Sequence, residues 1–202
     1  SLEIAKQMVG FGQEYKNQYL ANGRCYFDAL PGAVSTTSGT FPVASYQNDL
    51  QDFYNNLLFD LNVDVSSTSS LDPYVDIVTP YLQHDSFYWG WFSDRSTESF
   101  FRSTDTARIL FYNADYDSAI TARTLSTGNF IPLAISSGYL SAIGAMSNPT
   151  VDGFVRPRPL FFALNSGATL GEAYLIGDPY VDWTNSFFGD PLISVNFPEN
   201  KL

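Results

Sequence analysis

Residues 86–92 (SFYWGWF) constrain the fold more than any other segment of the chain. In a strand, successive side chains point to opposite faces of the sheet, so this segment places aromatic rings on both faces. Strands that are apolar on both faces are typical of parallel sheets with helices on each side. Residues 108–112 (RILFY) and 139–146 (YLSAIGAM) have the same character. The sequence therefore predicts a central, mostly parallel sheet.

Segments with helical spacing of apolar residues alternate with these strand-like segments. The expected helices cover residues 2–20, 46–60, 129–137, 160–164 and 170–176. The expected further strands cover residues 24–30, 62–65 and 192–195. The first two of these strands flank a helix, which predicts a β-α-β unit with parallel strands. The whole order predicts an α/β fold, as a three-layer α/β/α sandwich around the sheet.

A single domain is expected to span residues 1–202. The Ser/Thr-rich loops at 35–40 and 66–70 do not separate segments that have cores of their own. The chain is 45% hydrophobic and 16% aromatic. A chain of this length buries roughly 70% of its unfolded surface, so it needs neither a disulfide nor a metal in order to fold.

The charge balance excludes several classes of partner. Asp and Glu number 21 against 10 Lys and Arg, which gives a net charge of -11. Such a surface repels a phosphate backbone and an anionic membrane, so no nucleic-acid partner is expected. The sequence has no run of about 18 apolar residues, and we expect no membrane insertion. The composition, with one cysteine and few lysines, favours an extracellular or cell-surface protein of a bacterium.

A cysteine-histidine dyad is the first catalytic hypothesis, with Cys25 as the nucleophile and His84 as its base. Cys25 lies within an apolar, strand-like segment, where cysteine usually behaves as a small inert hydrophobe. His84 comes just before a strand, whereas sites in parallel sheets lie beyond the carboxyl ends of strands. A packed cysteine and an unrelated histidine are therefore the preferred interpretation.

Acidic residues in loops support two further hypotheses. Five aspartates lie in loops near expected strand ends and could serve a carboxylate-based hydrolase: Asp115, Asp117, Asp178, Asp182 and Asp190. Asn113, Asp115 and Asp117 alternate oxygen ligands and could hold Ca²⁺, although the glycine and the distant glutamate of an EF-hand loop are missing. Solvated loop carboxylates remain the preferred interpretation of both groups.

Two other features have a structural and a functional interpretation. Trp183 lies in a loop, where an aromatic ring could bind a sugar, so a carbohydrate-binding module is an alternative function. Residues 167–171 (GATLG) lack the lysine of a phosphate-binding loop. They are better interpreted as a turn that starts a helix, with Thr169 as N-cap and Glu172 in the first turn.

From about residue 87 onward, four segments carry a resemblance to a known family. They are residues 88–94 (YWGWFSD), 167–173 (GATLGEA), Asp182-Trp183 and residues 189–192 (GDPL), of which the last three have a fairly specific order and spacing. The chain resembles an uncharacterised family of secreted bacterial proteins associated with exosortase-type surface sorting. That family is distantly similar to the caspase and gingipain-like fold.

The resemblance implies a caspase/gingipain-like sandwich without the catalytic pair of its peptidase members. Those members have His-Gly at the end of the third strand and Cys at the end of the fourth. Here the two places hold residues 90–92 (GWF) and Asn113-Ala114. The family normally has additional sequence ahead of this region, so a longer precursor is implied.

The leading hypothesis is a non-catalytic extracellular or cell-surface domain for protein interaction or assembly, with self-association as one form of it. The chain has 17 Phe and 13 Tyr, which can exceed what one core buries, and surplus aromatic surface marks interfaces. The candidate binding residues are Trp91, Asp94, Trp183 and Asp190. A divergent hydrolase, either cysteine-based or carboxylate-based, and a carbohydrate-binding module stay open as alternatives.

Overall fold

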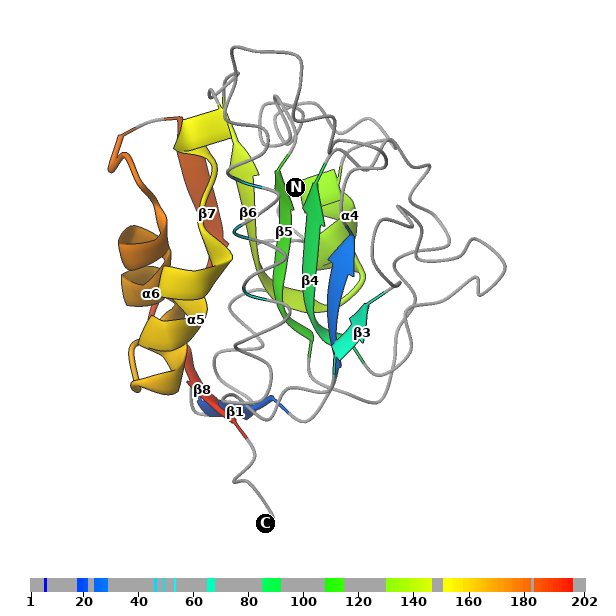
Figure 1. Cartoon of the computed structure of the whole chain (residues 1–202). Helices are drawn as coiled ribbons and strands as arrows, with labels where there is room; N and C mark the ends of the chain where they lie inside the picture. The colour runs from blue at the N-terminus through cyan, green and yellow to red at the C-terminus, as the bar shows by residue number, and fades with distance from the viewer. Residues whose placement is uncertain are drawn as a thin grey trace.

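The fold is α/β and is built on a six-stranded, mostly parallel sheet (Figure 1). The computed structural model describes residues 6, 18–21, 24–28, 46, 49, 53, 65–67, 85–91, 108–114, 130–146, 151–182 and 184–197. The strands lie in the order β3-β2-β4-β5-β6-β7. They are β2 (Arg24–Asp28), β3 (Val65–Ser67), β4 (Asp85–Trp91), β5 (Arg108–Ala114), β6 (Tyr139–Ala145) and β7 (Asn185–Gly189).

Strand direction in this sheet confirms the predicted parallel character. Every neighbouring pair from β3 to β6 is parallel, and only β7 runs antiparallel to its neighbour β6. The parallel pairing expected within the β-α-β unit is present between β2 and β3. Because β3 lies outside β2 and β4 lies on its other side, the chain order reverses between β2 and β4. In open α/β sheets, ligands bind beyond the carboxyl ends of strands at such a reversal.

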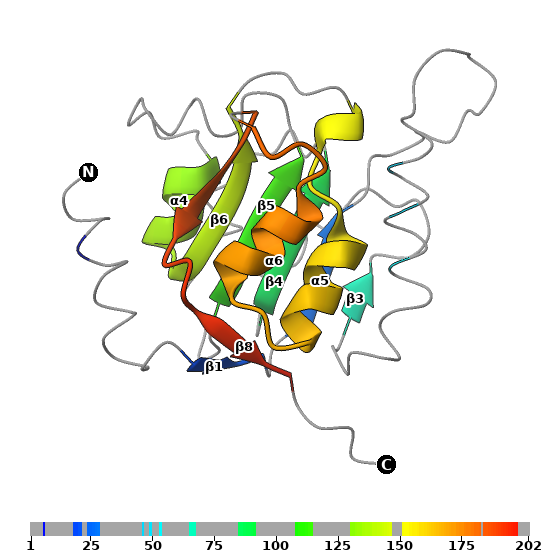
Figure 2. The ribbon, with the colours of Figure 1, turned by 90° about the vertical axis from the view of Figure 1, so that its left-hand side faces the viewer.

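Helices lie on both faces of the sheet among the described residues (Figure 2). One face is covered by α4 (Phe130–Ser136), and the other by α5 (Pro157–Asn165) and α6 (Leu170–Gly177). The three helices confirm those expected over residues 129–137, 160–164 and 170–176. None of the described helices has both the length and the apolar character needed to cross a membrane.

The aromatic strand β4 supplies rings to both faces, as its alternation predicts. Phe87 and Trp89 contact Phe161 of α5, with ring centroids 5.0 and 5.9 Å apart. Tyr88 points to the opposite face and stacks on Phe111 of β5 at 4.9 Å. All five rings are almost completely buried. Central position in the sheet thus explains why residues 86–90 of this strand carry no charge.

Local sequence signals fix the turn between α5 and α6. Beyond α5, Gly167 has a φ of +90°, and the N–H groups of Gly167 and Ala168 donate to Leu164 and Ala163 as in a Schellman motif. Thr169 then caps α6, because its hydroxyl accepts the Glu172 N–H while the Glu172 carboxylate accepts the Thr169 N–H. The predicted N-cap at Thr169 is therefore confirmed.

Several expectations near the chain ends and the sheet edges are wrong. Residues 18–20 form strand β1 (Gln18–Leu20) rather than the end of a helix. β1 pairs in parallel with β8 (Ser194–Asn196), so the expected last strand belongs to a separate two-stranded sheet. The last strand of the central sheet is β7, which the sequence did not predict. The strand expected over 62–65 begins at Val65 and runs into the supposed linker.

Candidate functional site

The carboxyl ends of β4 and β5 lie side by side next to the reversal of strand order. Gly90 is opposite Asn113, and Trp91 is opposite Ala114. The two places that the family resemblance assigns to a catalytic histidine and cysteine are therefore neighbours in the sheet. Neither place holds an imidazole or a thiol among these four residues. The side-chain positions of Trp91, Asn113 and Ala114 lie outside the described part of the structure.

Cys25 lies at the other end of the sheet. It is the second residue of β2, and its backbone is opposite Val65 of β3 and Phe87 of β4. Active sites of parallel sheets form at the carboxyl ends of strands, and Cys25 is near an amino end. His84 and the Cys25 side chain fall outside the described residues, so the dyad stays a prediction.

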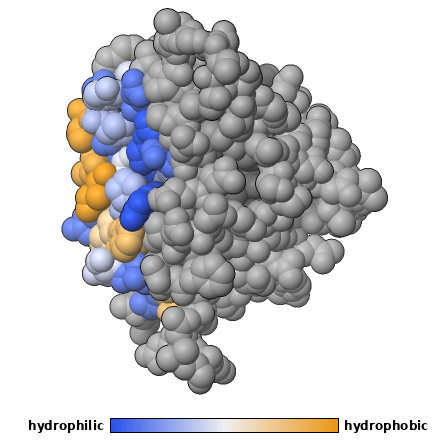
Figure 3. Space-filling model, viewed as in Figure 1, coloured by the Kyte–Doolittle hydropathy of each residue, from blue (hydrophilic) through white to orange (hydrophobic). Residues whose placement is uncertain are grey.

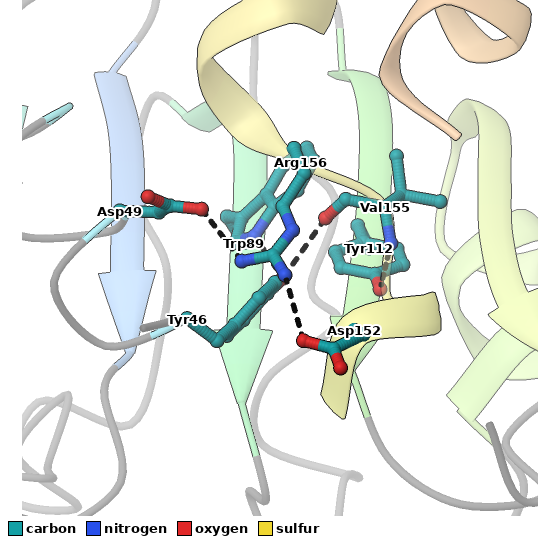
Figure 4. A network of polar contacts seen from close by, with 7 residues as sticks. All are labelled: Tyr46, Asp49, Trp89, Tyr112, Asp152, Val155 and Arg156. Atoms are coloured by element: carbon teal, nitrogen blue, oxygen red, sulfur yellow. Dashed lines mark hydrogen bonds and ion pairs between the residues drawn. The ribbon is translucent and has the colours of Figure 1, made fainter. Parts of the chain in front are cut away.

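A network of hydrogen bonds, which we call the Tyr46 network, lies near the carboxyl ends of β4 and β5 (Figure 4). Trp89 Nε1 donates to the Tyr46 hydroxyl at 3.1 Å, and that hydroxyl donates to the Val155 carbonyl at 3.1 Å. The Val155 N–H donates to the Tyr112 hydroxyl at 3.1 Å. These three hydrogen bonds join residue 46 to two strands and to the segment before α5.

The two tyrosines of the Tyr46 network stay neutral. Burial raises the pKa of both Tyr46 and Tyr112 well above the usual tyrosine range, since neither phenolate would be solvated. Arg156 lies over the Tyr46 ring, 5.0 Å from its centroid, and its Nη1 is 2.6 Å from Asp49 Oδ2. A neutral, fully bonded cluster of this kind holds segments together and offers no general base.

A second polar cluster, Asp178 with Asn185, is less complete. Asp178 ends α6 and Asn185 begins β7, and the two residues are only 5% and 3% exposed. Asn185 Nδ2 donates to the Gly153 carbonyl at 2.7 Å and to Asp178 Oδ1 at 3.0 Å. Asp178 Oδ2 and Asn185 Oδ1 are buried and accept no hydrogen bond. Each of the two side chains therefore keeps one buried oxygen without a donor.

Burial also perturbs the acidity of this cluster. Desolvation raises the pKa of Asp178, and hydrogen bonds from Asn185 and the Tyr180 N–H only partly offset the rise. Protonation would remove the charge that burial disfavours. Two side-chain oxygens are too few to hold Ca²⁺, which takes six to eight oxygen ligands.

The loop carboxylates mostly build turns. Asp178, Asp182 and Asp190 each accept the N–H of the residue two positions later, at 3.4, 2.6 and 2.9 Å. This is the Asx turn that aspartate forms with its own backbone. Hydrogen bonds from Thr184 lower the pKa of Asp182, so Asp178 and Asp182 shift in opposite directions. Opposite shifts are typical of acid-base pairs, but the buried Asp178 carboxyl is committed to its neighbours and is not presented to solvent.

Other predicted site residues fall partly outside the structure's description. Asn113 lies in β5, whereas Asp94, Asp115, Asp117 and Trp183 are among the residues that are not described. Within the described ranges, no three His, Cys, Asp or Glu side chains come together as a metal site. The calcium hypothesis therefore stays a prediction.

Among the residues that the structure describes, the most distinctive exposed feature is an apolar strip on α6 and its flanking loops. Five large apolar or aromatic side chains there are between 51% and 74% exposed. In Figure 3 orange side chains gather at the left edge of the molecule, where Figure 1 places α6. We call these residues the α6 strip: Leu175, Ile176, Tyr180, Val181 and Leu192.

The sequence carried a signal for this strip that periodicity alone did not use. In α6 the buried face is already supplied by Leu170, Ala173 and Gly177. Leu175 and Ile176 are apolar residues in excess of that face. A helix that is apolar on more than one face is either buried all round or exposes a patch.

Comparisons of this chain with models of protein families, with curated proteins and with solved structures gave no match, so its function is argued from the geometry above.

Proposed function

We propose that this chain is a non-catalytic domain that acts by binding other proteins, outside a bacterial cell or on its surface. The α6 strip carries the proposal, because its five large side chains are more than half exposed along one helix and its flanks. Contiguous apolar surface on a folded domain marks interaction sites. The carboxyl ends of β4 and β5 also support a non-catalytic role. The paired residues there are Gly90 with Asn113 and Trp91 with Ala114, and none of them has an imidazole or a thiol.

The finer fold assignment belongs to the same proposal. A caspase/gingipain-like sandwich, as in the exosortase-associated family that the sequence resembles, is supported by the parallel run from β3 to β6 and by helices on both faces. The adjacency of the third and fourth strand ends in the central sheet supports it further. Members of that fold that cleave peptides use those two strand ends, and their residues here favour a pseudoenzyme.

A peptide-selection experiment tests the binding role. A random peptide library displayed on phage is selected on the purified protein, and each clone is then measured against the double variant Leu175→Ser/Ile176→Ser. We expect clones whose affinity falls by about tenfold or more on the variant, because exposed apolar anchors dominate binding energy. Phe162→Ser is the matched control, since Phe162 is an exposed apolar residue on α5.

Two results would overturn the proposal. One is a selection that yields no clone, or only clones that bind the double variant as well as the wild type. The other is hydrolysis of a peptide or glycoside library by the purified protein that is lost in Cys25→Ala or in Asp182→Asn. The second result would instead favour the cysteine-based or the carboxylate-based hydrolase.

A further inference from the structure

We infer that the α6 strip takes a partner segment that carries apolar side chains flanked by lysine or arginine. This inference rests on the proposed binding function and specifies the chemistry of its partner. Three observations support it: the shape of the strip, the charge around it, and the cost of covering it with a second copy of the chain.

The strip is elongated. Leu192 lies near the start of α6, where the Gly171 N–H donates to the Pro191 carbonyl at 3.0 Å. Leu175 and Ile176 follow along the helix, and Tyr180 and Val181 lie just beyond its end. Eight helical residues extend about 12 Å, so the strip runs about this far along the axis of α6. Its form suits one extended or helical segment that lies along α6.

The charged residues in the chain segment that forms the strip are all acidic. No Lys, Arg or His occurs between Arg158 and Lys201, a stretch that includes α6 and every residue of the strip. Glu172 lies three and four positions before Leu175 and Ile176, on the same side of the helix. Asp182 adjoins Val181, and Asp190 bonds the Leu192 backbone. Arg156 also adjoins the end of α6, where its N–H donates to the Gly177 carbonyl, but its guanidinium is paired with Asp49 and Asp152. An apolar strip with three carboxylates beside it is complementary to apolar and basic side chains.

These carboxylates are held in the ionised form. Hydrogen bonds from the Thr169 backbone and hydroxyl lower the pKa of Glu172, and bonds from Thr184 lower the pKa of Asp182. Both side chains are exposed. They therefore keep their negative charge at neutral pH and below.

A second copy of this chain fits the strip poorly. In a two-fold symmetric dimer the same surface patch lies on both subunits. Pairing two α6 strips would bring Glu172 and Asp182 of each copy towards carboxylates of the other, in addition to a net charge of -11 on each chain. Like charges opposed across an interface disfavour that pairing.

A charge-matched pair of synthetic peptides tests the inference. Both are fluorescent helical peptides with leucine at positions i, i+3, i+4 and i+7, and they differ only in having lysine or glutamate at the remaining positions. Fluorescence anisotropy with the full chain is measured at low and at high salt. We expect the lysine peptide to bind at least about tenfold more tightly than the glutamate peptide at low salt. The difference in affinity should become smaller at high salt, because salt screens the carboxylates beside the strip.

Two sets of variants assign the binding to the strip. Leu175→Ser/Ile176→Ser should weaken binding of the lysine peptide about tenfold at both salt concentrations. Glu172→Gln/Asp182→Asn should weaken it severalfold at low salt only. Gln and Asn keep the acceptors that the capping box and the turn require, so both structural roles are preserved. Asp152→Asn, an exposed carboxylate before α5, is the control and should change nothing.

The outcomes separate this inference from the proposed function. Equal binding of the two peptides, or tighter binding of the glutamate peptide, overturns the inference, and so does binding of the lysine peptide that no strip variant reduces. If the phage selection still yields strip-dependent clones in that case, the binding function stands with a partner of other chemistry. A concentration-dependent dimer that Leu175→Ser/Ile176→Ser abolishes would show that a second copy covers the strip instead.

Discussion

Two polar clusters are attached to the same short segment, residues 153–156, and they are completed to different degrees. The first cluster consists of Tyr46, Trp89 and Tyr112, and it gives partners to both the N–H and the carbonyl of Val155. The second cluster consists of Asn185 and Asp178 next to Gly153, and two of its buried oxygens have no donor. The first cluster is neutral, whereas the second contains a carboxyl.

The difference shows which cluster holds the fold and which one responds to conditions. A fully bonded buried network rigidifies its surroundings, and removing a member leaves other groups unpaired. An incomplete network gains from any change that supplies the missing donor. A conservative substitution in the Tyr46 network should therefore lower the free energy of unfolding. A conservative substitution in the Asp178 cluster should raise it.

The largest expected effect follows from Tyr46→Phe. The substitution keeps the aromatic ring that packs on Phe154. It leaves the Trp89 N–H and the Val155 carbonyl buried without the hydroxyl that both of them bind. Two unsatisfied groups cost about 1–3 kcal/mol each, so we expect a loss of about 3 kcal/mol in the free energy of unfolding, measured by urea denaturation. Tyr180→Phe, at an exposed tyrosine, is the control. An equal loss of unfolding free energy in the two variants would contradict the structural role of the Tyr46 network.

A smaller effect of opposite sign is expected from Asp178→Asn. The asparagine oxygen still accepts from Asn185 Nδ2 and the Tyr180 N–H, and the neutral side chain removes a charge that burial disfavours. We expect the free energy of unfolding at pH 7 to rise by about 1 kcal/mol. Asp190→Asn is the matched control, because Asp190 lies in the same Gly-Asp-Pro sequence and builds the same turn. Destabilisation by Asp178→Asn alone would show that the carboxylate is needed in its charged form.

The smallest effect is the dependence of that gain on pH. Burial raises the pKa of Asp178 in the folded state, so its protonated form is favoured by folding. Its contribution to stability is full below the usual aspartate range and is lost as pH rises through the folded-state pKa. The stability difference between Asp178→Asn and wild type should therefore be near zero at about pH 3.5 and grow towards pH 7.

Taking the difference between two proteins isolates this group from its neighbours. Glu172 and Asp182 have lowered pKa values, so their contributions are present at neutral pH and are lost as pH falls. Both contributions occur in the wild type and in the variant, so that of Glu172 cancels in the difference and that of Asp182 enters only through its repulsion of Asp178. A difference that stays constant between pH 3.5 and pH 7 would contradict the buried, proton-binding state of Asp178.

Sequence periodicity predicted the centre of the molecule better than its edges. Residues 86–92 were recognisable as a central strand because burial on both faces leaves them entirely apolar or small. The Thr169-Glu172 cap was recognisable because both partners lie within four residues. β1 was missed, and the strand expected over 192–195 was assigned to the wrong sheet, because the pairing of β1 with β8 joins residues 18–20 to 194–196, a contact that no local pattern encodes. β7 was missed because its ladder with β6 depends on Gly189, which approaches the Leu140 carbonyl closely.

The candidate site was less accessible to sequence reasoning than the fold. Trp89 and Tyr112 read as core residues, which they are, but their hydrogen bonds depend on Tyr46 and Val155 from distant segments. Asp178 resembled the other loop aspartates in sequence, and only its contact with Asn185 sets it apart. Charge and burial of such groups follow from tertiary neighbours, whereas helical and strand periodicity follow from the chain itself.

The pairing of β1 with β8 has a consequence for mechanical load. The two strands are parallel, so the chain enters β1 at one end of the pair and leaves β8 at the other. A force that pulls residues 18 and 196 in opposite directions therefore strains the bonds of the ladder together, including that from Ala21 to the Asn196 carbonyl, rather than opening them one at a time. Forced unfolding is governed by the barrier to breaking such a clamp. A domain tethered through its two ends would hold its central sheet intact until this short clamp gives way.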